Sequence, residues 1–203
     1  MRRLSVSLPA ALAVLLWTGP ALAATATATF AGGCFWCMQP PFETLPGVVK
    51  TTVGYTGGTV KNPTYEQVSS GVTGHAESIE VVYDPAVVSY EKLLEVFWHN
   101  VDPLTRDAQF CDHGRQYRTS IFTHDDEQKR LAEASKEALQ KRFDRPIVTE
   151  IVAAGEFWPA EEYHQRYHEK NPIRYKYYRW NCGRDQRLEE VWGKDAPPKM
   201  AKP

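Results

Sequence analysis

The stretch that decides the fold runs from Thr25 to Cys37 and has the sequence TATATFAGGCFWC. Alternation from Thr25 to Phe30 predicts a β-strand. Two glycines then allow a sharp bend, and the spaced apolar residues after it predict a helix that begins close to Cys34. A thiol at the first turn of a helix lies at the positive end of the peptide dipoles, which lowers its pKa. The stretch therefore predicts a strand, a bend and a nucleophilic Cys34.

The N-terminal segment, residues 1–23, has the composition of an export signal. Two arginines precede an apolar run from Leu8 to Trp17, and Ala21-Leu22-Ala23 matches a small-residue cleavage site. We expect cleavage after Ala23 and a location in the bacterial periplasm or outside the cell. The apolar stretch is short for a membrane span and is interrupted by Pro9 and Pro20. An alternative is a lipoprotein in which residues 31–33 are the lipobox and Cys34 carries the lipid.

The length of the chain predicts one domain, and its charge argues against some classes of partner. Removal of residues 1–23 leaves 180 of the 203 residues, enough for one domain with its own core. We expect this catalytic domain over 24–195 and a flexible tail over 196–203. The formal net charge is −1, with neither a basic stripe nor a second apolar span, so we expect neither nucleic acid nor a membrane as partner. We also expect a monomer.

Hydrophobic periodicity predicts alternating strands and helices in this domain. Further strands are expected over 78–84, 119–123 and 147–154, and helices over 89–100, 125–143 and 159–169, with Ser89 and Asp125 as N-caps. Residues 54–77 and 102–118 are rich in Gly, Pro, Asn and Asp and predict long loops, where functional sites often form. The order of elements predicts an α+β domain with helices packed on a mixed sheet.

The four cysteines (Cys34, Cys37, Cys111 and Cys182) leave more than one interpretation open. In an exported protein they could form two structural disulfides, with three possible pairings. A domain of this size does not need such bridges, and Cys34 and Cys37 are too close in sequence to close a large loop. Cys34-x-x-Cys37 could instead be a redox pair, which makes a thiol–disulfide oxidoreductase an alternative function.

Six motifs, in order along residues 30–172, resemble those of the peptide methionine sulfoxide reductase A family. They are Gly32-Gly33-Cys34-Phe35-Trp36, Gly54-Tyr55-Thr56-Gly57-Gly58, Asn62-Pro63-Thr64-Tyr65, Gly74-His75-Ala76-Glu77, Asp112-His113-Gly114-Arg115-Gln116-Tyr117-Arg118 and Lys170-Asn171-Pro172. The resemblance implies a two-layer α/β sandwich with a ferredoxin-like core. It also implies reduction of the S epimer of methionine sulfoxide, free or in proteins, with no metal, flavin or nucleotide because cysteine holds the oxidising equivalent.

The same resemblance implies how the oxygen is removed. Cys34 would attack the sulfoxide sulfur as a thiolate. Glu77 would protonate the oxygen and must therefore be kept neutral by burial. Tyr65 and Tyr117 would donate hydrogen bonds to that oxygen. Taken alone, a carboxylate such as Glu77 is more often solvated, and the two tyrosines are more often packing residues.

Three further residues receive roles from the resemblance. Asp112 would order water or a tyrosine, although alone it is equally explained as a loop cap. Phe35 and Trp36 would form the cage for the S-methyl group. These residues complete the predicted substrate pocket around the Cys34 thiol.

Resolution of the Cys34 sulfenic acid is where the sequence departs from the family pattern. Many family members carry resolving cysteines in a glycine-rich C-terminal tail, whereas here that region holds Cys182 alone. Cys182 is the first candidate because Gly183 lets it swing, and Cys37 is the second because it is close. Cys111 is the third, beside Asp112. Electrons would come from a thioredoxin-like dithiol partner.

One other pattern concerns histidine. His164-x-x-x-His168 has the i,i+4 spacing of a metal-binding pair on a helix. No third ligand has suitable spacing. We therefore expect a solvated or hydrogen-bonded pair and no metal site.

Overall fold

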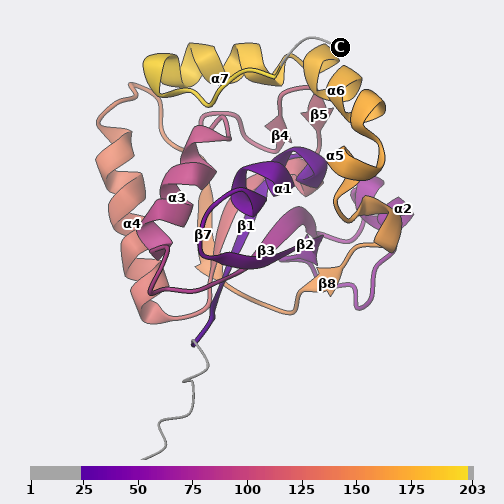
Figure 1. The fold of residues 1–203 in the computed structure, drawn as a ribbon, viewed down its shortest axis with the longest axis horizontal. Helices are drawn as coiled ribbons and strands as arrows, with labels where there is room; N and C mark the ends of the chain where they lie inside the picture. Colours follow the sequence, from indigo (N-terminus) through magenta and orange to yellow (C-terminus); the bar gives the residue numbers. More distant parts are fainter. Residues whose placement is uncertain (1–23, 201–203) are drawn as a thin grey trace, which may run out of the picture.

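The computed structural model describes residues 24–200, so the predicted export signal lies outside the described part. A central sheet is built from β1 (Ala26–Gly32), β2 (Val48–Thr56), β3 (Ala76–Tyr83), β6 (Thr119–Thr123), β7 (Glu150–Ala153) and β8 (Trp158–Pro159). Its strand order is β7-β6-β1-β3-β2-β8 (Figure 1). All neighbours are antiparallel except β6 and β7, which run parallel. The sheet is therefore mixed, as the sequence predicts.

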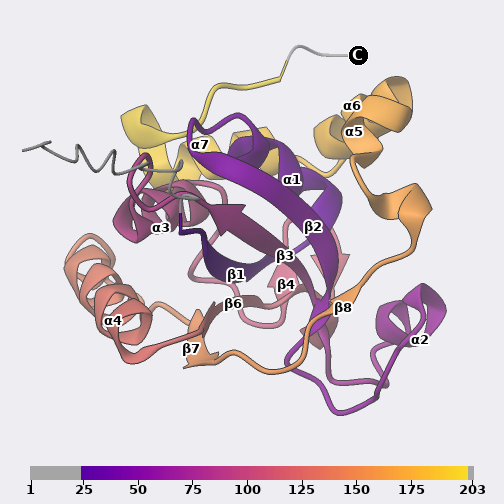
Figure 2. The same ribbon diagram turned by 60° about the horizontal axis from the view of Figure 1, so that its bottom comes forward.

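Helices cover this sheet and surround its end. They are α1 (Phe35–Glu43), α2 (Tyr65–Ser69), α3 (Tyr90–His99), α4 (Asp126–Gln140), α5 (Tyr167–Lys170), α6 (Pro172–Asn181) and α7 (Arg184–Trp192). The succession β1-α1-β2-β3-α3-β6 with spatial order β6-β1-β3-β2 is the split βαβ arrangement of ferredoxin-like folds. Figures 1 and 2 show α1, α3 and α4 beside the sheet and α6 at the periphery. The predicted α+β class is confirmed.

The core lies between the sheet and α1, α3, α4 and α7. Its fully buried side chains include Phe30, Met38, Phe42, Ile79, Leu93, Phe97, Ile121, Leu188 and Trp192. Phe30 stacks on both Phe42 and Phe97, with ring centroids 5.3 and 5.2 Å apart. The packing of aromatic side chains at this spacing adds to the free energy gained by burial. β1 thus supplies the centre of the core, and cleavage before a lipidated Cys34 would remove this strand.

Two predicted helix starts are confirmed by their caps. The Ser89 hydroxyl accepts a hydrogen bond from the Lys92 N–H at the start of α3. The Asp125 carboxylate accepts one from the Gln128 N–H at the start of α4, at 2.7 Å. Such side chains satisfy N–H groups that have no partner within the helix.

The predicted helix over 159–169 is wrong. Pro159 belongs to β8, and the rest divides into a 3₁₀ turn, Glu162–His164, and α5. Arg166 separates the two with φ 53°, a left-handed conformation that ends helical hydrogen bonding. The periodicity of the apolar residues in this segment reflects contacts with different neighbours and no continuous helix.

The two predicted loops carry more structure than expected. Residues 54–77 contain the end of β2, the short helix α2 with a Thr64–Gln67 capping box, and the start of β3. Residues 102–118 contain the hairpin of β4 (Ala108–Gln109) and β5 (Asp112–His113), followed by a 3₁₀ turn, Arg115–Tyr117. Most of β2, together with α6 and α7, was not predicted. The residues of α6 and α7 are mostly polar and aromatic and lack a clear apolar period.

The predicted tail begins in contact with the domain. The Met200 N–H donates to Asp185 Oδ2 at 2.9 Å, and Lys199 pairs with Glu189 at 2.6 Å. Whether residues 196–203 are flexible remains a prediction. Among residues 24–200, no helix has the length and apolar composition needed to cross a membrane.

The glycine bend after β1 is confirmed, and the structure shows why Gly33 is needed there. Gly33 has φ +78°, and a Cβ there would lie 2.5 Å from Cβ of Gln109 in β4. Gln109 is fully buried, and its side-chain amide bonds both the N–H and the C=O of Asp102. Only glycine fits this conformation and this contact, which joins the Cys34 turn to the hairpin.

We expect Gly33→Ala to lower the free energy of unfolding by roughly 2–3 kcal/mol, because it adds backbone strain and a clash with buried Gln109. Urea denaturation of both proteins would measure the difference. Gly155→Ala is the matched control, since a Cβ at Gly155 meets nothing within 4 Å and should change stability little. Equal losses in the two variants would contradict this account.

Candidate active site

A small pocket gathers every predicted catalytic and substrate-binding residue. It is lined by Cys34, Phe35, Trp36, Tyr65, Glu77, Asp112, Tyr117 and Tyr178. These residues come from the start of α1, the first residue of α2, β3, β5, the following 3₁₀ turn, and α6. The start of α1, the short helix α2, the hairpin of β4 and β5 and the helix α6 thus meet at one pocket. The sequence missed Tyr178, which lies outside all six motifs.

Glu77 is held as a neutral acid. Its carboxyl is 2% exposed, and its Oε2 accepts a hydrogen bond from the Phe35 N–H at 3.0 Å. Burial raises its pKa to about 8, although the Phe35 N–H favours the charged form, and Asp112 adds a smaller upward effect. The group therefore keeps its proton near neutral pH, as an acid that must deliver a proton requires.

Cys34 and Cys37 form a buried thiol pair in the first turn of α1. Cys34 is the N-cap, 6% exposed, and the Cys37 N–H donates to its carbonyl at 3.0 Å. The pKa of Cys34 is raised, first by burial and then by the neighbouring Cys37 thiol. The Cys34 thiol lowers the pKa of Cys37 to about 6, with help from Arg184 and Arg179 and against the effect of burial. The two thiols therefore share one negative charge, and the prediction of a lowered pKa at Cys34 itself is wrong in the resting pair.

Tyr65 and Tyr117 keep their hydroxyl protons. Burial is the main cause that raises the pKa of each above its ordinary value, and Glu77 adds to it. The Tyr65 backbone is fixed by its N–H bond to Glu161 Oε1 at 2.8 Å, and the Tyr55 hydroxyl holds the other oxygen of Glu161. Two hydroxyl donors therefore line the pocket beside the acid.

Asp112 lies at the pocket wall and is held by Tyr178. The Tyr178 hydroxyl donates to Asp112 Oδ2 at 2.5 Å. Burial raises the pKa of Asp112, and the Tyr178 bond and the Arg184 charge oppose this effect. Asp112 therefore connects the hairpin of β4 and β5 with α6.

Aromatic rings form the remaining wall. Phe35 is 1% exposed. Trp36 stacks on Tyr167 with centroids 3.8 Å apart, and its indole N–H donates to His164 Nδ1 at 3.0 Å. The indole can only donate, so Nδ1 of His164 is unprotonated; burial also lowers the pKa of His164 to about 4. His164 and Tyr167 orient Trp36; the sequence had singled out His164 only for its spacing to His168, and nothing in it pointed to Tyr167.

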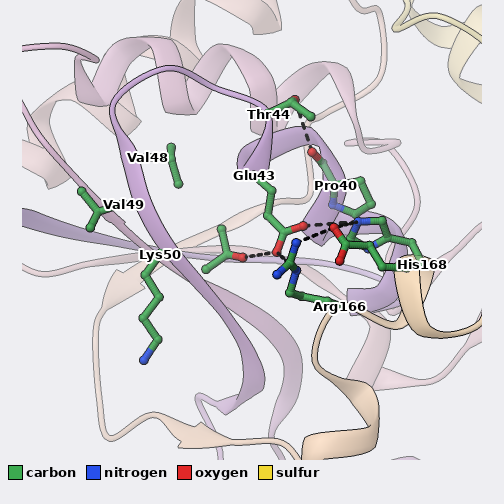
Figure 3. Close-up of a pocket in the computed structure, with 10 residues that line it drawn as sticks. Pro40, Glu43, Thr44, Val48, Val49, Lys50, Arg166 and His168 are labelled. Atoms are coloured by element: carbon green, nitrogen blue, oxygen red, sulfur yellow. Dashed lines mark hydrogen bonds and ion pairs between the residues drawn. The ribbon is translucent and has the colours of Figure 1, made fainter.

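The predicted histidine pair does not form a common site. His164 packs on Tyr65, with centroids 4.4 Å apart, whereas Nε2 of His168 lies 3.3 Å from Glu43 Oε2. Figure 3 shows Arg166 and His168 directed at Glu43 in a second surface pocket. Arg166 also pairs with Glu169. Arg166 thus lies between Glu43 and Glu169, and the group is an ion-pair cluster that lies outside the thiol pocket.

The remaining cysteines are joined. Cys111, exposed beside β5, and Cys182, half-buried at the end of α6, form a disulfide across 71 residues. Cys34 and Cys37 are free, so the interpretation of two structural disulfides does not describe this structure. Cys182, the first predicted resolving thiol, thus has Cys111 as its partner, and Cys37 lies against Cys34.

A buried thiol pair that shares a charge, beside an acid that stays neutral, can take an oxygen atom from a substrate and return it as water. This chemistry places the site in the class of thiol-dependent reductases.

Comparison with known proteins identifies the family. The family model described as peptide methionine sulfoxide reductase matches residues 26–196. A peptide methionine sulfoxide reductase MsrA of Bacillus licheniformis is 53% identical over 169 residues, which cover 82% of this chain and 93% of that protein. The chain belongs to the peptide methionine sulfoxide reductase family.

Solved structures agree with this assignment. The reduced form of Mxr1 from Saccharomyces cerevisiae superposes with a TM-score of 0.70 and 33% identity, covering 73% of this chain and 87% of that one. Mxr1 in complex with Trx2 gives a TM-score of 0.51 and 26% identity, covering 70% and 84%.

The raised pKa of Glu77 predicts a specific pH dependence of stability. The folded protein keeps a proton up to about pH 8 that the unfolded chain releases near 4.5, so the free energy of unfolding falls as pH rises between these values. In Glu77→Gln this loss is absent. Between about pH 5 and pH 8 the wild type should lose roughly 3–4 kcal/mol more than the variant, as measured by denaturant titration. Parallel pH curves would show that Glu77 ionises normally.

Proposed function

We propose that this chain reduces the S epimer of methionine sulfoxide to methionine, free or within proteins, and so repairs oxidative damage. The observation that supports this most strongly is a carboxylic acid, Glu77, with a pKa of about 8 in the same pocket as the Cys34 thiol. A sulfoxide oxygen accepts a proton as its bond to sulfur breaks, and an anionic carboxylate could not supply one. Family membership supports the same reaction.

The first step transfers oxygen. The proton shared by the thiol pair moves to Cys37, and the Cys34 thiolate attacks the sulfoxide sulfur. Glu77 donates its proton to the oxygen, with the hydroxyls of Tyr65 and Tyr117 as hydrogen-bond donors to the developing charge. The sulfur–oxygen bond of the substrate breaks, methionine leaves, and Cys34 holds the oxygen as a sulfenic acid.

Phe35 and Trp36 would receive the apolar end of the substrate. Phe35 is buried against Tyr55 and His164, and the indole of Trp36 is fixed by its stack on Tyr167. Rigid apolar walls favour the S-methyl group, while the polar side of the pocket holds the oxygen. Such a division also selects one sulfoxide epimer, because exchanging methyl and oxygen would leave the oxygen without donors.

We assign Cys37 as the thiol that resolves the sulfenic acid. It lies one helical turn from Cys34, its N–H donates to the Cys34 carbonyl at 3.0 Å, and its pKa of about 6 favours the attacking thiolate. Its sulfur attacks Cys34, hydroxide leaves and takes up a proton to form water, and a Cys34–Cys37 disulfide results. This disulfide would be buried, so a protein reductant could not reach it directly.

The outer cysteines would then carry the oxidising equivalent to the surface. A dithiol of Cys111 and Cys182 would reduce the inner disulfide and become the disulfide present in this structure. Cys111 is exposed and open to a thioredoxin-like partner. The similarity to Mxr1, which is known in complex with Trx2, supports a partner of this kind. In this scheme Cys182 does not resolve the sulfenic acid, as the sequence first suggested. It takes part in the next step, the exchange with the Cys34–Cys37 disulfide.

The predicted export signal over residues 1–23 supports action outside the cytoplasm, in the periplasm or beyond. A partner there would need reducing equivalents supplied across the membrane, because that compartment is oxidising. We also propose that the protein acts as a monomer.

The direct test is stereospecific turnover. Purified protein should consume the S epimer of a blocked methionine sulfoxide with dithiothreitol as reductant and leave the R epimer unchanged. Cys34→Ser should abolish turnover, and Glu77→Gln should lower kcat/KM by about 10²–10⁴, the usual contribution of a general acid. Consumption of neither epimer by folded protein would overturn the proposal and favour the thiol–disulfide oxidoreductase.

The cysteine assignment is tested by mass spectrometry after one turnover without reductant. Cys37→Ser should stop at the Cys34 sulfenic acid, trapped with dimedone, whereas a variant with Cys111 and Cys182 both changed to Ser should form the inner disulfide. With a thioredoxin and its reductase, the double variant should turn over slowly, because only the outer pair is exposed. A Cys34–Cys182 disulfide formed directly in Cys37→Ser at the wild-type rate would restore Cys182 as the resolving thiol.

A further inference from the structure

Arg184, the first residue of α7, is a buried cation with an unusual set of partners. Its side chain is 1% exposed. One guanidinium nitrogen, Nη2, donates to the Asn100 carbonyl at 2.7 Å and lies 3.4 Å from the Gly32 carbonyl and 3.1 Å from Met38 Sδ. Its Nε is buried with no hydrogen-bond partner among the described residues.

Arg184 has neutral partners only, in contrast to the neighbouring buried arginine. Arg179 pairs with Asp185 at 2.6 Å. Within residues 24–200, no carboxylate lies within ion-pair distance of Arg184. An unpaired charge in the interior costs several kcal/mol, so such groups normally have a counter-ion.

The contacts of Arg184 surround the thiol pair. Gly32 comes two residues before Cys34, and Met38 comes directly after Cys37. On its other side the guanidinium lies over the Phe110 ring, 4.3 Å from the centroid, next to Cys111. The charge therefore lies beneath the turn that holds both inner cysteines.

We propose that Arg184 is the counter-ion of the thiolate shared by Cys34 and Cys37, a positioning residue that keeps one sulfur ionised inside the protein. The inference deepens the proposed function, because both the attack on the sulfoxide and the resolution of the sulfenic acid require a thiolate. In resolution, the Cys37 sulfur forms the new bond to Cys34 while the sulfur–oxygen bond breaks and hydroxide leaves with a proton. The same cation would stabilise the attacking charge in each turnover.

Other charged and titratable groups face the thiol pair, and none replaces Arg184. Glu77 from β3 is neutral near pH 7. Asp112 from β5 is influenced by the Arg184 charge at longer range but forms no ion pair with it, and it would add negative charge beside the thiols. From α6, Tyr175 and Tyr178 keep their protons, and Arg179 is already paired with Asp185. The pocket tyrosines Tyr65 and Tyr117 also stay protonated. Arg184 is thus the one cation of this group without a carboxylate partner among the described residues.

The test measures thiolate formation directly, on the reduced protein with Cys111 and Cys182 both changed to Ser. Thiolate ultraviolet absorbance and the rate of iodoacetamide alkylation are followed against pH. In Arg184→Met the lower thiol pKa should rise by at least about one unit, so the alkylation rate near pH 6 should fall about tenfold. Arg184→Lys should recover most of the thiolate because it keeps the charge.

Two controls separate electrostatics from folding. Arg184→Gln keeps an amide donor for the Asn100 carbonyl but loses the charge, so it should show the same rise as Arg184→Met. Arg187→Met, on the same helix, removes an arginine paired with Asp102 at 2.8 Å and should leave the thiol pKa unchanged. A thiol pKa that stays at the wild-type value in folded Arg184→Gln would overturn the proposal. Alkylation needs no sulfoxide, so this result is independent of whether either epimer is reduced.

Discussion

The hydrogen bond from the Phe35 N–H to Glu77 Oε2 is the contact on which the rest of the site depends. It fastens the first turn of α1 to the middle of the sheet, at a residue of β3 that pairs with Tyr55 of β2. The bond uses an N–H that the helix itself cannot satisfy. It also fixes the distance between the acid and the adjacent Cys34, because Cys34 and Phe35 share a peptide bond. The acid and the nucleophile are therefore positioned by one contact between backbone and side chain.

The same burial that makes Glu77 a useful acid opposes ionisation of the thiols beside it. A dry pocket raises the pKa of every acidic group, which is wanted for the acid and unwanted for the nucleophile. The structure separates the two effects by distributing donors and cations unevenly. Glu77 receives a single N–H, while each thiol has the other beside it and the buried charge of Arg184 close to their turn. Two acidic groups in one pocket can therefore hold opposite protonation states near neutral pH.

Hydrophobic periodicity, capping residues and glycines predicted the parts of the fold that are determined by residues close together in the chain. The strand over 119–123, the caps at Ser89 and Asp125 and the bend at Gly33 follow from residues close in the chain. Glu77 and the pocket tyrosines were found through the family motifs, since nothing local distinguishes them from surface or packing residues. The roles of Tyr178 and His164 were missed because they exist only through Asp112 and Trp36, which lie 66 and 128 residues away. Arg184 is a similar case, since a charged residue in a polar helix is normally solvated.

The two cysteine pairs differ most in exposure, and this difference explains why the chain would need both. Chemistry at Cys34 benefits from exclusion of water, because donors and charges act more strongly in a dry site. The same exclusion prevents a protein reductant from reaching the sulfur. An outer pair, with Cys111 exposed and Cys182 at the end of the helix that carries Tyr178, connects the dry pocket to the surface. The hairpin of β4 and β5 holds Asp112 in the pocket wall, and the adjacent residue Cys111, in the turn before β5, lies outside the pocket. Neighbouring residues of one turn therefore belong to the reaction site and to the proposed exchange site.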